Sequence, residues 1–408
     1  MDRRYFLQGS AALIGSGALG LSGCVRKPVI AASVSAPPLP FYDAVGPLPP
    51  IRAHVDRIFR ITVCLRPFRP AGPRMDVERV GEKTVVHNYG HGGSGWSLSW
   101  GSADMAVRKA LEAANGGREV AVIGCGALGL TAAITAQRAG LKVTIYAKER
   151  PPYVRSARAT GSWTPDSRIA LISAAGPDFA AKWEAMARTS FAMYQSYLGM
   201  PGTPIEWTDR YALSDETHEG NVAQDPSQGT HDWAHYNRRI ADLTPHQQEI
   251  PAGMHPFPTK YVWRSTSLTF NVADYSRQLM NDFLIAGGVI ETREFHSPQE
   301  VASVVQPVII NCTGYGARQL WSDESIVPVR GQIAWLIPQE GVNYGLNYRG
   351  VYVLGRRDGI VVQPNTNGEE SGWNDSNEQP DRAEAEGGVE VLQELYSRME
   401  KMQKSARS

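Results

Sequence analysis

The chain has 408 residues, 42% of them hydrophobic and 20% charged, which is enough for two domains or for one large α/β unit with an inserted sheet. Its 41 basic and 41 acidic residues cancel, which argues against nucleic acid or an anionic membrane surface as the main partner. The four cysteines, Cys24, Cys64, Cys125 and Cys312, show no spacing typical of a zinc site, so no metal is predicted.

Residues 1–24 are interpreted as an export signal. Arg3 and Arg4 precede a weakly apolar stretch of small residues, as in twin-arginine signals. The stretch ends in Leu-Ser-Gly-Cys, which resembles a lipoprotein processing site with Cys24 as the acylated residue. Cleavage near Ala31 to Ala36, releasing a soluble protein, remains open. We expect twin-arginine export to the periplasm or cell envelope, with a lipid anchor at Cys24 as the one contact with the membrane.

Residues 25–50 are rich in proline and predict an extended linker. Ile58 to Leu65 predicts a strand that leads into Arg66-Pro67-Phe68-Arg69-Pro70. The prolines stiffen the backbone around Arg66 and Arg69, so their guanidinium groups lose little entropy on binding a carboxylate. Two ordinary surface arginines would give the same pattern.

A glycine-rich loop runs from His87 to Gly95, after a predicted strand at 84–86. Its four glycines leave backbone amides and carbonyls bare, which lets main chain contact a flat ligand. A helix is predicted over residues 97–114, with the positive end of its dipole at this loop. His87 and His91 have no carboxylate or cysteine beside them, so they are not interpreted as metal ligands.

The most informative stretch is Arg118 to Glu149. Its apolar run at 120–123 predicts a buried parallel strand, and Gly124, Gly126 and Gly129 follow at G-x-G-x-x-G spacing. The first glycine makes the turn, the second lets backbone approach a pyrophosphate, and the third lets a helix pack on the strand. The stretch therefore predicts a dinucleotide site.

A helix at 127–138 and a strand at 143–146 complete the predicted βαβ unit. An acidic residue for the ribose usually ends the second strand, where this chain has Ala147. Two interpretations remain open: Glu149 binds the ribose hydroxyls from further on, or Lys148 contacts a phosphate.

The rest of the chain alternates helical and extended patterns. Helices are predicted at 175–198, 271–286 and 389–402, strands at 289–295 and 308–314, a mostly antiparallel layer within 203–266, and an acidic surface loop at 368–386.

Several stretches together resemble the FAD-dependent D-amino-acid oxidase family. HNYGHGGSGWSLSWGSA is similar to the family signature, LRPFRP to its substrate-arginine segment, residues 159–163 to its flavin-wrapping loop, and VIINCTG to the strand that returns under the dinucleotide. The first two stretches precede the G-x-G-x-x-G here instead of following it. We therefore expect a circular permutation, with residues 115–118 joining the old C-terminal helix to the first strand.

The resemblance implies an α/β fold: a Rossmann-like FAD-binding domain with a second, mostly antiparallel β-sheet substrate domain. The expected FAD-binding domain comprises residues 51–175 and 287–328. The expected substrate-binding domain comprises residues 176–286 and 329–400.

The resemblance also implies roles for individual residues. Arg66 is expected to bind the substrate carboxylate, Tyr352 to donate its hydroxyl to the same carboxylate, and Tyr348 to cover the site. The backbone carbonyl of Gly93 is expected to accept a hydrogen bond from the substrate amine. The residues expected to contact FAD are Gly92, Gly93, Ser94, Gly95, Trp96, Ser97, Gly124, Gly126, Ala127, Leu128, Gly129, Lys148, Glu149, Thr160, Gly161, Ser162, Trp163, Phe295, Thr313 and Gly314.

The implied reaction is oxidative deamination of a D-amino acid with a neutral side chain, by hydride transfer to flavin N5. Molecular oxygen is the expected second substrate, and a 2-oxo acid, ammonia and hydrogen peroxide are the products. D-Aspartate as substrate would need a second cation, for which Arg349, Arg356 and Arg357 are candidates.

Two further interpretations remain open: a lipid-anchored dehydrogenase that uses a membrane electron acceptor, and a non-catalytic FAD-binding relic. The chain also departs from the family pattern. Arg155 and Arg158 stand where small hydroxylated residues are usual, and Ser94 where an aromatic residue is usual.

Overall fold

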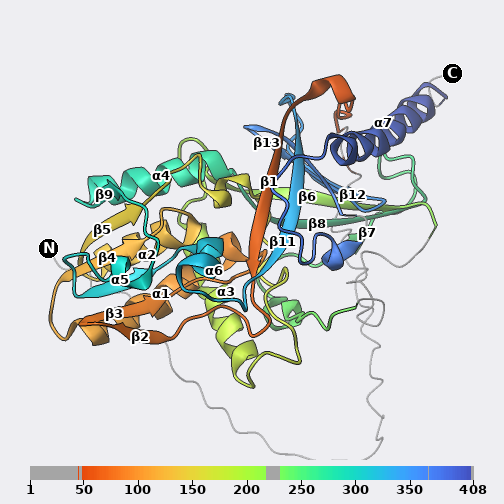
Figure 1. Cartoon of the computed structure of the whole chain (residues 1–408). Coiled ribbons are helices and arrows are strands. Elements are labelled where there is room, and N and C mark those ends of the chain that lie inside the picture. Colours follow the sequence, from red (N-terminus) through yellow and green to blue (C-terminus); the bar gives the residue numbers. More distant parts are fainter. Residues whose placement is uncertain (1–44, 46–47, 217–229, 366, 406–408) are drawn as a thin grey trace, which may run out of the picture. The chain divides into compact units, whose positions relative to one another are not determined.

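The structure, a computed structural model, describes residue 45 and residues 48–216, 230–365 and 367–405 (Figure 1). The predicted export signal and most of the predicted linker lie outside the described residues. Within them, no helix has both the length and the apolar character needed to cross a membrane.

One sheet carries the dinucleotide motif. Among the described residues it has six strands, in the order β2 (Val77–Val80), β3 (Lys83–His87), β10 (Val308–Asn311), β4 (Glu119–Ile123), β5 (Lys142–Ala147) and β9 (Val289–Thr292). All neighbouring strands are parallel except β2 and β3. Apart from their first residues, β3, β4 and β10 are fully buried, as expected for parallel strands covered on both faces. The predicted Rossmann-like part is confirmed.

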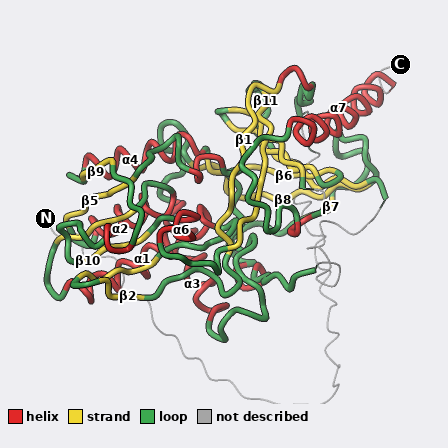
Figure 2. The backbone as a smooth tube through the Cα atoms, viewed as in Figure 1, coloured by secondary structure: helices red, strands yellow, loops and turns green. Residues whose placement is uncertain are grey.

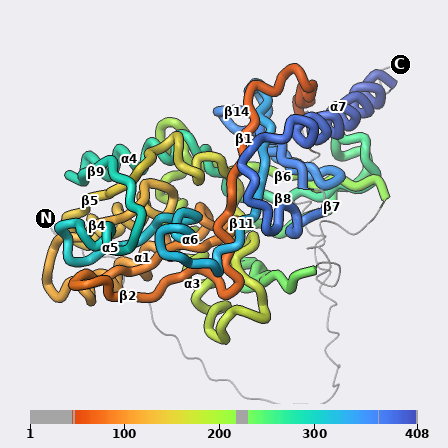
Figure 3. The backbone as a smooth tube through the Cα atoms, in the orientation of Figure 1, coloured from red at the N-terminus to blue at the C-terminus, as the bar shows by residue number. Residues whose placement is uncertain are grey.

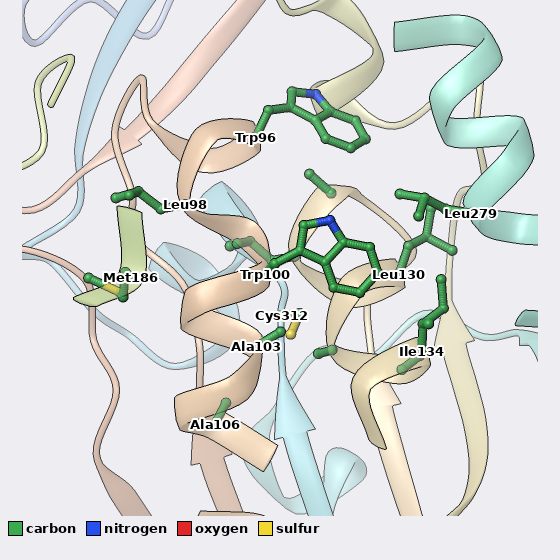
Figure 4. Close-up of a cluster of buried hydrophobic side chains, with 14 of the residues drawn as sticks. Trp96, Leu98, Trp100, Ala103, Ala106, Leu130, Ile134, Met186, Leu279 and Cys312 are labelled. Carbon is green, nitrogen blue, oxygen red and sulfur yellow. The ribbon is translucent and has the colours of Figure 1, made fainter. Parts of the chain in front are cut away.

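Four long helices pack together beside this sheet: α1 (Gly95–Ala114), α2 (Ala127–Arg138), α3 (Phe179–Gln195) and α4 (Val272–Ile285). Figure 4 shows Trp100 of α1 among side chains of α2 and α4. Its indole N–H donates to the Tyr275 hydroxyl at 2.7 Å, so the buried polar group has a partner. Gly101 lets α3 come close, since a Cβ there would lie 2.2 Å from the Met186 carbonyl oxygen.

The second sheet has eight strands within the described residues (Figure 2), in the order β1 (Ile58–Phe68), β11 (Val327–Leu336), β14 (Gly359–Pro364), β13 (Val351–Arg356), β12 (Gly345–Tyr348), β6 (Ile205–Ser214), β8 (Tyr261–Phe270) and β7 (Gln248–Glu249). Its neighbours are antiparallel except β12 and β6. The predicted mostly antiparallel layer is confirmed. The early strand β1 lies beside the late strand β11 (Figure 3).

A C-terminal helix, α7 (Arg382–Ser405), packs on the second sheet. Val389, Leu392 and Tyr396 share the i, i+3, i+7 spacing of one helix face and are buried in one cluster with Val353 and Val362 of the sheet. The remaining short helical elements are α5 (Pro298–Val301), α6 (Ala317–Leu320) and 3-10 turns at residues 55–57, 155–158, 237–240, 314–316 and 368–370.

The structure differs from the predicted domain boundaries. β1 belongs to the eight-stranded sheet, although it falls within 51–175, and α3 and α4 pack with α1 and α2, although they fall within 176–286. A strand's own residues do not reveal which sheet it joins, because its hydrogen-bond partner comes much later in the chain. The end of the predicted linker is also docked: the Pro49 carbonyl accepts a hydrogen bond from the Tyr344 hydroxyl at 2.9 Å.

An ion-pair cluster fastens α7 to the sheet. Arg398 of α7 donates to both carboxylate oxygens of Asp215, at 3.0 and 2.8 Å, and the Tyr348 hydroxyl donates to Asp215 at 2.8 Å. These hydrogen bonds, with Arg398 the largest cause, lower the pKa of Asp215 to about 2. The ionised carboxylate therefore stabilises the fold above its ordinary pKa of 3.8, and this contribution is lost as the pH falls through about 2.

We predict that Asp215→Asn lowers the free energy of unfolding by ~1–2 kcal/mol at pH 7, measured by urea denaturation. The difference from the unsubstituted protein should shrink as the pH falls from 4 towards 2, since protonation then removes the same charge. Asp56→Asn is the control, because that carboxylate is 74% exposed. A difference that stays constant with pH would contradict this assignment.

Candidate active site

A cavity of about 880 Å³ is lined by residues of both sheets. The loops after four parallel strands contribute to it: Gly92 after β3, Gly124 after β4, Lys148 after β5 and Thr313 after β10. Ligands of open parallel sheets bind outside the carboxyl ends of the strands, so this is the expected position for a nucleotide.

The glycine turn after β4 has the geometry that its spacing predicts. Gly124 has φ +109°, and a Cβ there would lie 2.6 Å from the Cys312 carbonyl oxygen. Gly126 lines the cavity, whereas Gly129 does not. A Cβ at Gly129 would lie 2.0 Å from the Gly124 carbonyl oxygen, so this glycine lets α2 pack on the turn.

The loop after β3 lines the same cavity through Gly92, Gly93, Gly95 and Trp96. It is clamped by residues 167 and 168: a Cβ at Gly92 would lie 1.8 Å from the Arg168 carbonyl oxygen, and the Gly93 N–H donates to the Ser167 carbonyl at 3.0 Å. The clamp fixes the loop's backbone against the cavity before any ligand binds.

His91 in this loop tests whether the cavity suits FAD. Its side chain is buried and lines the cavity, and neither ring nitrogen has a hydrogen-bond partner among the described residues. Burial lowers the pKa of His91 to about 3, so the neutral ring keeps one donor and one acceptor. Buried polar groups are rarely left without partners, so a bound polar ligand is indicated. With the two glycine loops, these groups fit FAD.

The structure places most predicted FAD contacts in this lining: Gly92, Gly93, Gly95, Trp96, Gly124, Gly126, Ala127, Leu128, Lys148, Glu149, Thr160, Gly161, Ser162, Phe295, Thr313 and Gly314. Lys148 is 3.3 Å from the Glu294 carboxylate. Both interpretations of Lys148 and Glu149 stay open, because both residues line the cavity.

Three other predicted contacts, like Gly129, are not in the lining. The Ser94 hydroxyl donates to the Ser167 carbonyl at 3.0 Å, and the Ser97 hydroxyl accepts from the Thr164 N–H at 2.9 Å. Trp163 packs edge-on against Phe191 in the core. These residues support the loops that line the cavity. A sequence pattern does not distinguish a residue that supports such a loop from one that contacts the cofactor.

Arg66 and Arg69 have different environments. Arg69 forms an ion pair with Asp323 at 3.1 Å and is part of the loop structure. Arg66 lines the cavity, donates to the Arg330 carbonyl at 3.1 Å and forms no ion pair with any described carboxylate within 4.0 Å. Burial lowers the pKa of Arg66, but a guanidinium stays charged at neutral pH. A cation without a counter-ion is therefore available to an anionic ligand.

The two predicted tyrosines lie on opposite faces of the sheet. Asn347 pairs with Tyr352 across β12 and β13, and both line the cavity, whereas Tyr348 pairs with Val351 and is in the core. Side chains alternate between faces along a strand, so Tyr348 does not cover the site. Burial raises the pKa of Tyr352, so its hydroxyl keeps its proton and can donate.

The sequence did not identify a polar group on the cavity wall: Asp166, Arg168, His235 and Glu369. Glu369 falls within the stretch predicted to be an acidic surface loop. That prediction is wrong for Glu369, because this residue lines the cavity and its carboxylate lies 3.3 Å from the His235 ring. No local signal identifies these residues, since acidic stretches are usually solvated.

The predicted candidates for a second cation do not line the cavity. Arg349 pairs with Asp215 and Glu394, and Arg356 pairs with Asp358 at 2.6 Å. Arg357 is also outside the lining.

Arg155 and Arg158, which depart from the family pattern, do line the cavity. They lie 2.7 and 3.8 Å from the Glu378 carboxylate.

In the part of the chain that the structure describes, no group of three His, Cys, Asp or Glu side chains could hold a metal ion.

We predict that Gly331→Ala weakens carboxylate binding without removing FAD. A Cβ at Gly331 would lie 2.4 Å from the Arg66 guanidinium, the flexible end of a side chain, so Arg66 must move. We expect FAD content to be unchanged and the Kd for propionate, measured by flavin absorbance, to rise about tenfold, or ~1.4 kcal/mol. Gly176→Ala is the matched control, since its Cβ has no neighbour within 4 Å. An unchanged Kd in Gly331→Ala would show that Arg66 does not bind the carboxylate.

Comparison with known proteins identifies the family. Residues 119–407 match the family model described as FAD dependent oxidoreductase. The chain is 28% identical over 214 residues to D-amino-acid oxidase of Dictyostelium discoideum, covering 52% of this chain and 55% of that protein. It is 29% identical over 216 residues to D-amino-acid oxidase of Streptomyces coelicolor, covering 53% of this chain and 58% of that protein. The chain thus spans less than two thirds of the length of these relatives.

Among solved structures, L-amino acid deaminase from Proteus vulgaris is similar with 14% identity and a TM-score of 0.46, covering 69% of this chain and 74% of that chain. The family match begins at Glu119, the first residue of β4, and continues almost to the C-terminus. The chain belongs to the FAD-dependent oxidoreductase family, and FAD is its cofactor.

Proposed function

We propose that the protein oxidises D-amino acids to 2-oxo acids and ammonia, with molecular oxygen as electron acceptor. The observation that carries the proposal is that one cavity is lined by the G-x-G-x-x-G turn and by the guanidinium of Arg66, which has no ion-pair partner among the described residues. The first holds a dinucleotide and the second suits a carboxylate.

Substrate binding is assigned to Arg66 and Tyr352. Arg66 presents two N–H groups to a carboxylate in a planar fork, and the Tyr352 hydroxyl donates a further hydrogen bond. The Gly93 carbonyl accepts from the substrate amine, which selects the unprotonated amine. Fixing the carboxylate, the amine and the α-C–H, three substituents of the α-carbon, distinguishes its two hands, and the names of the relatives favour the D form.

Catalysis then depends on orientation. FAD, when bound, supplies the two-electron acceptor. The residues of the chain hold the α-C–H of the substrate in reacting position, which can account for much of the rate. The N-terminus of α1, where Gly95 and Trp96 line the cavity, would favour negative charge on a bound flavin through its positive partial charge. The resulting imino acid hydrolyses, and oxygen takes up the two electrons and two protons as hydrogen peroxide.

Circular permutation and export remain part of the proposal. The family match begins at β4, yet the preceding strands β1 and β3 pair with β11 and β10 from late in the chain. This pairing supports a permuted order of the same elements. We also propose twin-arginine export and lipid attachment at Cys24, on the sequence pattern alone.

We predict that Arg66→Met lowers kcat/KM for D-amino acids at least 30-fold, equivalent to ~2 kcal/mol, because the substrate carboxylate loses its counter-ion. The measurement is a peroxide assay on purified holoenzyme, and Arg52→Met, which replaces an exposed arginine, is the control. Normal kinetics in Arg66→Met would reject the assignment.

The reaction class is tested with the unsubstituted protein. We expect D-alanine, but not L-alanine, to bleach the flavin without oxygen, and air to restore its colour with release of hydrogen peroxide. Bleaching that only an artificial dye reverses would indicate a dehydrogenase. No bleaching by any D-amino acid would indicate a non-catalytic protein.

A further inference from the structure

We propose that Arg168 and Arg66 together form a two-cation site that selects substrates with two carboxylates. This inference rests on the proposed function and assigns it a preference for short acidic D-amino acids over the neutral side chains implied by the family resemblance.

Arg168 is a buried cation that lines the cavity. Its side chain belongs to a residue only 6% exposed, and its φ of +48° is a strained value for a side-chain-bearing residue. The Arg168 carbonyl lies so close to Gly92 that a side chain there would clash with it. The segment that contacts the glycine loop therefore also positions this guanidinium. A strained backbone with a buried charge is typical of a functional position.

The hydrogen bonds of Arg168 fix one edge of its guanidinium. Nε donates to the Glu369 carbonyl at 2.8 Å, and Nη2 donates to the Gly368 carbonyl at 2.9 Å and to Asn365 Oδ1 at 3.4 Å. The remaining nitrogen, Nη1, donates to none of the described residues. The partners so far are neutral carbonyl groups, which orient the cation but do not neutralise it.

Arg168 forms no direct ion pair with a described carboxylate, although the charges of Glu369 and Glu370 act on it from further away. No described carboxylate lies within 4.0 Å of it. Both carboxylates have closer partners: Glu369 lies 3.3 Å from the His235 ring, and Glu370 lies 2.7 Å from the His231 ring.

Arg66 adds a second positive charge that acts on Arg168. Burial and the charge of Arg66 lower the pKa of Arg168 to about 10, which leaves it protonated at neutral pH. Arg66 and Arg168 repel each other in the desolvated cavity unless an anion lies beside each. A dicarboxylate supplies both anions, whereas a monocarboxylate leaves Arg168 uncompensated.

The test compares succinate with butyrate, which has the same carbon number and one carboxylate. Each is titrated into the holoenzyme, and its Kd is measured from the change in flavin absorbance. We expect succinate to bind at least tenfold more tightly than butyrate. Arg168→Met should abolish this preference, Arg168→Lys should retain part of it, and Arg238→Met, which replaces an exposed arginine, should not alter it.

Equal Kd values for succinate and butyrate in the unsubstituted holoenzyme would overturn the proposal, even if Arg168→Met failed to fold. A preference that persists in folded Arg168→Met would also overturn it. The same assignment predicts that kcat/KM for D-aspartate or D-glutamate exceeds that for D-asparagine or D-glutamine at least tenfold. A succinate preference without turnover of any amino acid would reject the proposed function and retain the two-cation site.

Discussion

The candidate site depends on one piece of strand pairing, the antiparallel contact between β1 and β11. Arg66 lies opposite Val329 in this register, and its guanidinium reaches the Arg330 carbonyl and the bare backbone of Gly331. Without this pairing, a cation from early in the chain would not face loops that follow the parallel strands. A sheet register cannot slip by one residue without turning every side chain to the other face, so the pairing fixes which residues line the cavity.

Three side chains on the wall of this cavity lack, within the described part of the chain, the partners that buried groups of their kind normally have. Among the described residues, His91 lacks hydrogen-bond partners, and Arg66 and Arg168 form no ion pair with a carboxylate. Each is costly in the ligand-free protein, because buried polar and charged groups are normally satisfied. The cost is consistent with a cavity whose polar groups are completed by a cofactor and an anionic substrate.

Local sequence patterns predicted the parts of the fold whose causes are local. The helix predicted at 127–138 has those bounds as α2, because a glycine turn starts it and Gly140 follows its end. The site was predicted where a motif specifies backbone shape, as at Gly124 and Gly92. The site was not predicted where contacts with distant parts of the chain decide which way a side chain points. Tyr348 and Tyr352 look alike in sequence, and only the pairing of β12 with β13 shows that they lie on opposite faces of the sheet. Arg168 and Glu369 come from loops whose composition is that of ordinary surface.

The most direct test of this account is a crystal structure of the protein with FAD and a bound carboxylate such as propionate. We expect the pyrophosphate at the Gly124 turn, the isoalloxazine ring beside the Gly93 backbone, and the carboxylate within hydrogen-bond distance of Arg66. A carboxylate bound away from Arg66, or a flavin ring remote from Gly93, would contradict it.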